Sequence, residues 1–223
     1  MESRYERNVP ALTNAECALL RHKRVLVVGC GGLGGHIIDQ LSRIGIGFLR
    51  VVDGDVFESS NLNRQLLSRI GLLGSSKAKG AADHVAQVNP DVSVEAVEVF
   101  MTRQKAAELI ADCDIVMDAL DNIPSRRLLS AVCAEAGIPY VYGAIQGWVA
   151  QAAISMPGDL LIDRLYPQEI VIRDKSVLSF TPALCASMQT SLCVKWLTGR
   201  PVETGKIFYF DLLNQEFETI PIL

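Results

Sequence analysis

The sequence lacks long apolar runs, a secretion signal and an excess of positive charge. No apolar stretch in its 223 residues reaches the roughly 18–20 residues that a membrane-spanning helix needs. No basic start is followed by an apolar run and a small-residue cleavage site, as a secretory signal requires. The formal net charge of −4 gives no electrostatic footprint for nucleic acid. We therefore expect a cytoplasmic protein without membrane or nucleic-acid partners, in which any bound phosphate is held by local groups.

Closely spaced cysteine pairs are also missing. The six cysteines are scattered, and no two of them form a C-x-x-C pair: Cys17, Cys30, Cys113, Cys133, Cys185 and Cys193. Neither a zinc site nor a disulfide framework is therefore predicted. We expect most of these thiols to be reduced and several to be buried.

Apolar runs of strand length alternate with helical patterns over the first two-thirds of the chain. "RVLVVG", "FLRVVDGD" and "DIVMDAL" read as buried strands, and residues 75–89 and 125–137 read as helices. From residue 140 the pattern changes to adjacent strands, a loop near 157–180, a helix over 183–199 and a final strand pair. The sequence predicts an α/β fold, Rossmann-like and doubly wound, with a mostly parallel sheet extended by antiparallel strands in the C-terminal third.

A glycine-rich loop joins the first predicted strand to the helix after it. Gly29, Gly31 and Gly34 satisfy G-x-G-x-x-G, which lets backbone N–H groups and a helix N-terminus approach a phosphate. Asp53 ends the next strand, where an acid accepts hydrogen bonds from ribose hydroxyls. NAD, FAD and ATP all fit this pattern.

Two cations downstream favour ATP among these ligands. Arg64 follows the loop "DGDVFESSNLN", and Lys77 opens the next predicted helix. A triphosphate can use both cations, whereas a nicotinamide site has no evident need for them. The alternative is that both are solvated surface charges.

Acidic and amide side chains cluster at the end of the strand "DIVMDAL". Asp118, Asp121 and Asn122 lie at the carboxyl edge of the predicted sheet, where open α/β sheets bind ligands. A carboxylate beside a triphosphate would bind Mg²⁺. Taken singly, such a residue is more often a helix cap. The interpretation of Asp121 as a Mg²⁺ ligand is therefore supported only by the other candidate site residues.

Together these pieces resemble the ThiF/MoeB/HesA family, the bacterial relatives of ubiquitin-activating enzymes. Members of that family adenylylate the C-terminal glycine of small ubiquitin-like sulfur-carrier proteins. The matching segments keep the family's order over about two-thirds of the chain: "RYER" at 4–7, "VVGCGGLGG" at 27–35, "VVDGDVFESSNLNRQ" at 51–65, "GSSKAKGAADHVAQVNP" at 74–90, "DALDN" at 118–122 and "IPYVYGAIQGWVAQ" at 138–151.

The resemblance implies a role for each matched residue. It places Arg7 on the opposing subunit's site, which predicts a symmetric homodimer with catalytic residues Arg7, Arg64, Lys77 and Asp121. It implies that Asp121 holds Mg²⁺, that Asp53 takes the ribose, and that ATP is bound by Gly29, Gly31, Gly32, Gly34, Asp53, Asn61, Arg64, Lys77, Asp121 and Asn122. It also implies a single adenylating domain over 1–223, with a helical arm (1–23), a nucleotide-binding core (24–145) and an extension with a crossover loop and packing helix (146–223).

The chain departs from the family pattern in two places. Many relatives bind zinc through two C-x-x-C pairs, but the first region here reads "SMPGDLLIDRLYP" and the chain stops at "IPIL", so we expect no zinc. Some relatives carry a cysteine in the crossover loop, but "PQEIVIRDKSVLSFTP" has none. Cys185 lies just beyond that loop, and a buried core cysteine is its favoured interpretation.

The leading hypothesis is ATP- and Mg²⁺-dependent adenylylation of the C-terminal carboxylate of a ubiquitin-like sulfur carrier ending in Gly-Gly, with release of pyrophosphate. The molybdopterin and thiamine pathways both use such carriers, and the sequence does not choose between them. Two alternatives stay open at this point. One is an NAD- or FAD-dependent oxidoreductase, which the glycine loop alone permits. The other is a protein that binds a ubiquitin-like fold without activating it.

Overall fold

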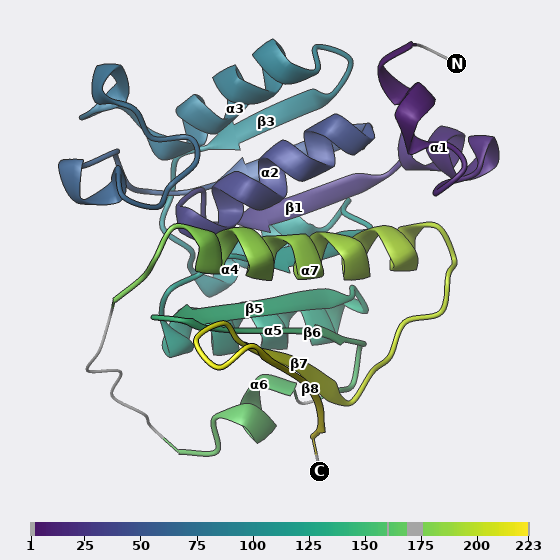
Figure 1. The fold of residues 1–223 in the computed structure, drawn as a ribbon, viewed down its shortest axis with the longest axis vertical. Helices are drawn as coiled ribbons and strands as arrows, with labels where there is room; N and C mark the ends of the chain where they lie inside the picture. The colour runs from purple at the N-terminus through teal and green to yellow at the C-terminus, as the bar shows by residue number, and fades with distance from the viewer. Residues whose placement is uncertain (1–2, 160, 169–175, 223) are drawn as a thin grey trace.

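The computed structural model describes residues 3–159, 161–168 and 176–222 (Figure 1). Its α-helices are α1 (Asn14–Leu20), α2 (Gly32–Ile44), α3 (Lys77–Val88), α4 (Arg103–Ile110), α5 (Ile123–Ala136), α6 (Leu161–Leu165) and α7 (Phe180–Leu197). Its strands are β1 (Arg24–Val28), β2 (Phe48–Val52), β3 (Ser93–Val97), β4 (Ile115–Asp118), β5 (Tyr140–Gln146), β6 (Val149–Ser155), β7 (Lys206–Asp211) and β8 (Glu216–Pro221). Short 3₁₀ helices are η1 (Ser3–Asn8), η2 (Ser59–Asn61) and η3 (Ile70–Leu72).

These strands form one sheet in the order β3-β2-β1-β4-β5-β6-β7-β8. The first five pair in parallel, and β6, β7 and β8 continue the sheet in antiparallel pairs. The predicted fold class is therefore confirmed. Val28 of β1 lies opposite Val52 of β2 and Asp118 of β4, so these three strands end at the same edge.

Helices cover both faces of the parallel part of the sheet. Alternate residues of a strand point to opposite faces, and on β1 the side chains of Val25 and Val27 join one buried cluster whereas Leu26 joins the other. The first cluster includes side chains of α2, α3 and α7, and the second includes side chains of α4, α5 and α6. Figure 1 shows this division, with α2, α3 and α7 in front of the sheet and α5 behind it. Burial on both faces explains why the central strands are continuous apolar runs.

The N-terminal arm is fastened to the far end of α7. Thr13 caps α1 and forms a capping box with Glu16. Arg200, which follows α7, donates to both carboxylate oxygens of Glu16 at 2.6 and 2.8 Å. These bonds, Arg200 first and the Thr13 amide second, lower the pKa of Glu16 to about 2.

Two helices were not predicted from the sequence. Thr102 caps α4, which buries Ala106, Leu109 and Ile110 against the second cluster. The other, α6, interrupts the loop expected near 157–180. The predicted packing helix is present as α7 and begins three residues earlier than expected, at Phe180. Residues 169–175 of the expected crossover loop lie outside the described residues.

All six cysteine thiols are free, and each cysteine is buried in the folded chain. The expectation that several of these cysteines are buried is therefore confirmed. Within the described ranges, no helix combines the length and the apolar character needed to cross a membrane.

Candidate functional site

A cleft of about 420 Å³ opens at the edge where β1, β2 and β4 end. Small-molecule sites in proteins have volumes of this order, and open α/β sheets place them at this edge. Most of the predicted nucleotide residues line the cleft, namely Gly29, Gly31, Gly32, Asp53, Arg64, Lys77, Asp121 and Asn122. The structure therefore brings together residues that are up to 93 positions apart in the sequence.

The glycines of the loop are needed for different structural reasons. Gly29 has a φ of +99°, and a Cβ there would lie 2.5 Å from the carbonyl oxygen of Ala119. A Cβ on Gly34 would lie 1.7 Å from the carbonyl oxygen of Gly29, so Gly34 lets α2 close on the loop rather than lining the cleft. Gly31 and Gly32 have no neighbouring atom within 3.3 Å of an added Cβ. Their backbone is therefore the part that an anion can approach.

Helix α2 begins at this loop, and its first residues, Gly32 and Leu33, line the cleft together with Gly31. Gly31 is the N-cap and has no side chain to accept hydrogen bonds from these amides. The first N–H groups of a helix have no partner within it and carry partial positive charge. A phosphate group supplies the missing acceptors, so the loop fits the α-phosphate region of a nucleotide.

Asp53 links the glycine loop to the end of β2. One carboxylate oxygen accepts from the N–H of Cys30 at 2.7 Å, and the other accepts from the N–H of Asp55 at 2.8 Å. Burial raises the pKa of Asp53, although these two hydrogen bonds oppose the rise. Each oxygen keeps a second lone pair, which suits the two hydroxyls of a ribose.

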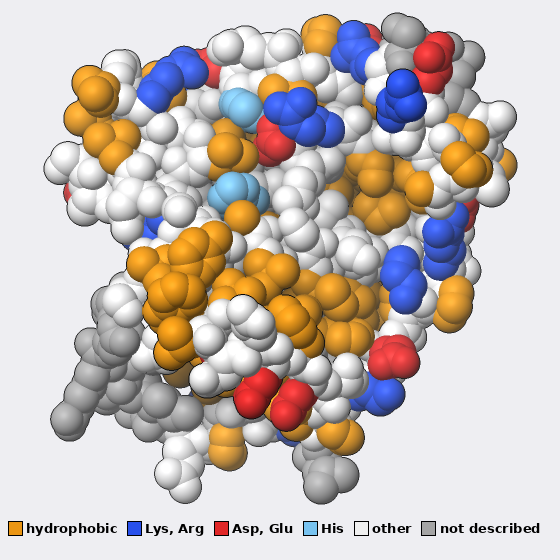
Figure 2. Space-filling model, in the orientation of Figure 1, with side chains coloured by type: hydrophobic (Ala, Val, Ile, Leu, Met, Phe, Trp, Pro, Cys, Tyr) orange, Lys and Arg blue, Asp and Glu red, His pale blue; other side chains and the backbone are white. Residues whose placement is uncertain are grey.

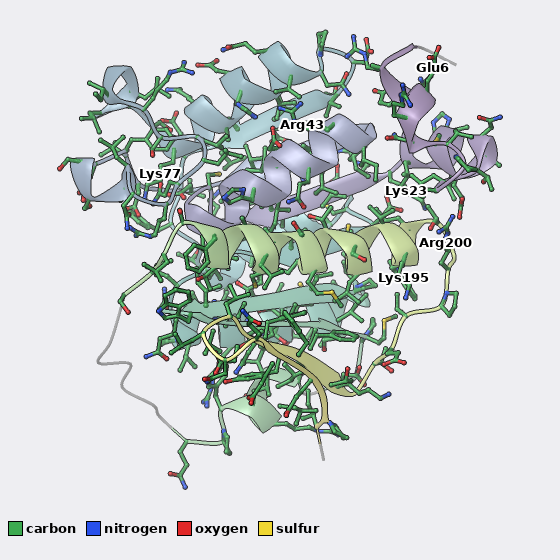
Figure 3. The ribbon with its side chains drawn as sticks, viewed as in Figure 1. Glu6, Lys23, Arg43, Lys77, Lys195 and Arg200 are labelled. Carbon is green, nitrogen blue, oxygen red and sulfur yellow. The ribbon has the colours of Figure 1, made fainter. Side chains whose placement is uncertain are left out.

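Lys77 is a buried cation on the wall of the cleft. It is the first residue of α3, is 8% exposed, and its ammonium lies 3.2 Å from the Asp55 carboxylate (Figure 3). Arg64 is half-buried and donates to the carbonyl oxygen of Ser60 at 3.0 Å. Lys77 is therefore not the solvated surface charge of the alternative interpretation, and both cations line the same cleft.

The three polar residues at the end of β4 and just beyond it have different roles. Asp121 is exposed on the cleft wall, and its carboxylate accepts from the Asn122 amide at 3.2 Å. Asn122 also caps α5 by accepting from the N–H of Ser125 at 2.9 Å. Asp118 is fully buried and does not line the cleft, because it is paired with Arg126 at 3.1 Å. Of the three, Asp121 alone directs a carboxylate toward the cleft.

Oxygen ligands suit Mg²⁺, and the Asp121 carboxylate is such a donor. In the described part of the chain, no three histidine, cysteine, aspartate or glutamate side chains gather as a metal cluster would require. A Mg²⁺ ion at Asp121 would therefore take most of its ligands from phosphates and water, which is usual for this ion.

Two predicted residues lie away from the cleft of their own chain. Asn61 is 6% exposed, and its side-chain oxygen accepts from the N–H of Glu58 at 3.1 Å to close the turn at η2. Arg7 is exposed on η1. In Figure 3 its neighbour Glu6 lies at the upper right of the molecule and the cleft residue Lys77 lies at the upper left. The phosphate contacts of Asn61 and Arg7 stay predictions.

Sequence reasoning missed several residues of the cleft lining. Asp55, Phe100, Arg126 and Tyr166 all contribute to it. Arg126 carries a signal that could have been used, because it lies one helical turn after Asn122 on the helix that the segment "DALDN" opens. Phe100 and Tyr166 come from loops, where no periodic pattern indicates which side chain turns inward.

The cysteines nearest the cleft do not have the properties of nucleophiles. The Cys185 thiol lies 3.2 Å from the carbonyl oxygen of Gln151, and burial raises its pKa to about 12. Burial also raises the pKa of Cys30 well above its ordinary value. Reactive cysteines are thiolates with lowered pKa values. The favoured interpretation of Cys185 as a core residue is confirmed by its complete burial.

The sequence profile of the ThiF family matches residues 5–222. The SAMP-activating enzyme E1 of Haloferax volcanii is 39% identical over 210 residues, which cover 91% of this chain and 77% of that protein. The sulfur carrier protein adenylyltransferase of Thermus thermophilus is 32% identical over 217 residues, covering 91% and 80%. The chain spans 60% of the length of the probable adenylyltransferase/sulfurtransferase MoeZ of Mycobacterium tuberculosis. Among solved structures, PaaA shares the fold, with a TM-score of 0.79 over 94% of this chain and 76% of PaaA at 24% identity.

Proposed function

The chain belongs to the ThiF family, and on that premise we propose that it adenylylates the C-terminal carboxylate of a ubiquitin-like sulfur-carrier protein, using ATP and releasing pyrophosphate. The observation that carries the proposal is the convergence of Arg64, Lys77 and Asp121 on a cleft that also holds the glycine loop. The relatives named as a SAMP-activating enzyme and as a sulfur carrier protein adenylyltransferase support the choice of substrate. An oxidoreductase would have no evident use for this charge arrangement.

The chemistry fits the residues present. A carboxylate oxygen of the carrier attacks the α-phosphorus of ATP, and the bond from that phosphorus to the bridging oxygen of pyrophosphate breaks. The attacking carboxylate is already ionised near neutral pH, so no general base is needed. Both reactants are anions, and Lys77 and Arg64 offset their repulsion while holding the phosphates in line. The loop amides before α2 stabilise the charge on the transferred group.

Asp121 is the residue proposed to hold Mg²⁺. When bound, this ion neutralises charge on the leaving pyrophosphate. The hydrogen bond from Asn122 orients the Asp121 carboxylate and leaves its other oxygen for the ion. Asn122 itself is fixed as the cap of α5, so the pair has a rigid base.

The proposed working form is a symmetric homodimer in which Arg7 completes the site of the partner. Arg7 is not among the residues that line the cleft of its own chain. In Figure 3 its neighbour Glu6 lies at the upper right and the cleft residue Lys77 at the upper left. Figure 2 shows a broad apolar area on the face that carries α7. Contiguous exposed apolar surface is typical of an interaction face. This area supports pairing of two chains through that face.

Exchange of radiolabelled pyrophosphate into ATP tests the proposal, using purified carriers that end in Gly-Gly. We expect carrier-dependent exchange by the wild type and its loss in Asp121→Ala. Asp83→Ala is a matched control, since Asp83 is an exposed aspartate on α3 outside the cleft lining, and it should keep wild-type exchange. Wild-type exchange no greater than that of Asp121→Ala with any carrier would refute the proposal.

Two binding measurements separate the alternatives from the proposed reaction. A preference for NAD over ATP would favour an oxidoreductase. Carrier binding without ATP consumption would favour a non-catalytic binding protein. Tighter binding of ATP than of NAD, together with carrier-dependent exchange, supports adenylylation.

A further inference from the structure

A buried ion pair lies beneath the cleft, and the proposed reaction does not use it. Arg126 is 5% exposed and Asp118 is completely buried. A guanidinium nitrogen of Arg126 lies 3.1 Å from a carboxylate oxygen of Asp118. Removing two charges from water is costly, and a buried ion pair is often no more stabilising than apolar residues of the same size. Its presence at this position therefore needs a reason other than stability.

Arg126 joins the two strands that flank the cleft floor. Its guanidinium donates to the carbonyl oxygen of Gly143 on β5 at 2.6 Å and to the carbonyl oxygen of Leu120, just after β4. It also lies over the ring of Tyr142, 5.1 Å from the ring centroid. Arg126 itself lines the cleft. A single side chain thus fixes the spacing between the ends of β4 and β5.

Asp118 holds the same short segment from the other side. One of its oxygens accepts from the N–H of Leu120 at 2.9 Å, and the other accepts from the Tyr140 hydroxyl at 2.5 Å. Gln189 of α7 donates to the Asp118 carbonyl oxygen at 2.7 Å. Both the N–H and the C=O of Leu120 are therefore fixed by the ion pair, one by Asp118 and one by Arg126.

The residue that follows Leu120 is Asp121. We propose that Arg126 and Asp118 are positioning residues that hold the Asp121 carboxylate where it binds the metal ion of the nucleotide complex. This inference rests on the role of Asp121 proposed above. In this inference, the segment from Leu120 to Asn122 is held rigid by the ion pair as well as by the Asn122 cap. A displacement of about 1 Å at a reacting group can cost a factor of about 100 in rate.

Arg50 provides a matched control within the same sheet. It is 9% exposed and donates to the Glu95 and Asp112 carboxylates at 2.8 and 2.6 Å and to the carbonyl oxygen of Leu109 at 2.5 Å. Like Arg126, it is a buried arginine that bonds carboxylate and carbonyl oxygens, although its partners Glu95 and Asp112 are about half exposed. Neither Arg50 nor these partners line the cleft. An effect due only to loss of a buried arginine would appear equally in Arg50→Gln and Arg126→Gln.

The first test measures the gain in ATP affinity on adding Mg²⁺, by calorimetry without carrier. We expect the Mg²⁺-dependent gain in ATP affinity to be at least tenfold smaller in Arg126→Gln than in the wild type. Arg126→Lys should recover part of the gain. Arg50→Gln should keep the wild-type gain. An equal loss in Arg50→Gln and Arg126→Gln would overturn the inference.

A double-mutant cycle with Asp121→Ala provides the second test. If Arg126 acts through Asp121, then Arg126→Gln has less than a twofold further effect on the Mg²⁺-dependent gain in the Asp121→Ala background. An undiminished effect in that background would overturn the inference. Amide hydrogen exchange at Leu120 should also quicken in Arg126→Gln, because Arg126 no longer holds the Asp118 carboxylate that accepts from this N–H.

These experiments distinguish the inference from the function on which it rests. Wild-type pyrophosphate exchange by Asp121→Ala would contradict the proposed function itself. Loss of exchange in Asp121→Ala combined with a wild-type Mg²⁺ effect in Arg126→Gln would contradict the positioning role alone. If Arg126→Gln does not fold, Tyr140→Phe removes one hydrogen bond to Asp118, and it should weaken the Mg²⁺-dependent gain by more than twofold. A wild-type gain in Tyr140→Phe would then overturn the inference.

Discussion

Replacement of Lys77 by glutamine removes a positive charge from the cleft and leaves the fold largely unchanged. The Lys77 ammonium is buried against the cleft wall, and its one hydrogen-bonded carboxylate, Asp55, has a side chain that is 57% exposed. After the substitution, water can solvate Asp55, so the loss of stability is that of a surface ion pair, about 0–1 kcal/mol. For a chain of this size we expect the melting temperature to fall by no more than about 4 °C.

The effect on activity is expected to be larger than the effect on stability. A hydrogen bond between a charged donor and a phosphate contributes about 1.5–3 kcal/mol. At about 1.4 kcal/mol per factor of ten, this is roughly a 10- to 150-fold loss in kcat/KM for ATP. The loss should be concentrated in kcat if Lys77 contacts the phosphate oxygens more strongly as charge shifts to pyrophosphate.

Pyrophosphate exchange at varied ATP concentration measures this loss, and Lys79→Gln is its control. Lys79 lies two residues along α3, but its side chain is 69% exposed and pairs with Glu98 outside the cleft lining. We expect Lys79→Gln to stay within twofold of wild type. Exchange by Lys77→Gln within threefold of wild type would contradict the phosphate contact. An equal fall in both variants would show that net charge, rather than position, matters.

Arg7→Ala should lower exchange by about 10- to 150-fold without dissociating the dimer, and mixing it with Asp121→Ala should partly restore exchange; no restoration would exclude a contribution in trans. Gly34→Ala should abolish ATP binding measured by calorimetry, because its Cβ would lie 1.7 Å from the carbonyl oxygen of Gly29, and retained affinity would contradict this packing. Glu16→Gln should lower the urea midpoint at pH 7, because the pKa of Glu16 falls on folding from 4.5 to about 2. This contribution is present above pH 4.5 and is lost as the pH falls toward 2, so a constant difference across that range would refute it.

The parallel core was predictable because both of its faces are buried. In β1 every buried position, from Val25 to Val28, is then apolar, and such a run is visible in a single sequence. Helix α4 was missed because its sequence, "RQKAAELI", has only three buried residues on one turn of an otherwise polar segment. Helix α6 has five residues, which is too short to show a helical period. Contacts with the rest of the fold, rather than local sequence, define both helices.

The cleft was predictable where backbone geometry demands a residue type. Gly29 has a positive φ, which favours glycine, and Asp53 directly follows strand β2. Both residues could therefore be recognised from the sequence. Gly34 and Asn61, which we predict to bind ATP, are not among the residues that line the cleft. Packing explains the glycine at 34 and turn closure explains the asparagine at 61, because these demands select the same residue types as ligand binding. Arg126 could not be assigned from the sequence, because its role depends on the carbonyl groups of Leu120 and Gly143. These two groups come close together only in the folded chain.

The burial of all six cysteines gives the protein an internal reporter of its own opening. A water-soluble disulfide reagent reaches a thiol only when the structure around it opens, so the rate of labelling measures the free energy of that opening. Cys30 lies in the glycine loop and Cys193 lies in the middle of α7. If ATP orders the loop, labelling of Cys30 slows when the nucleotide is added, while labelling of Cys193 follows global unfolding. Ligand binding can therefore be followed site by site without introducing a probe.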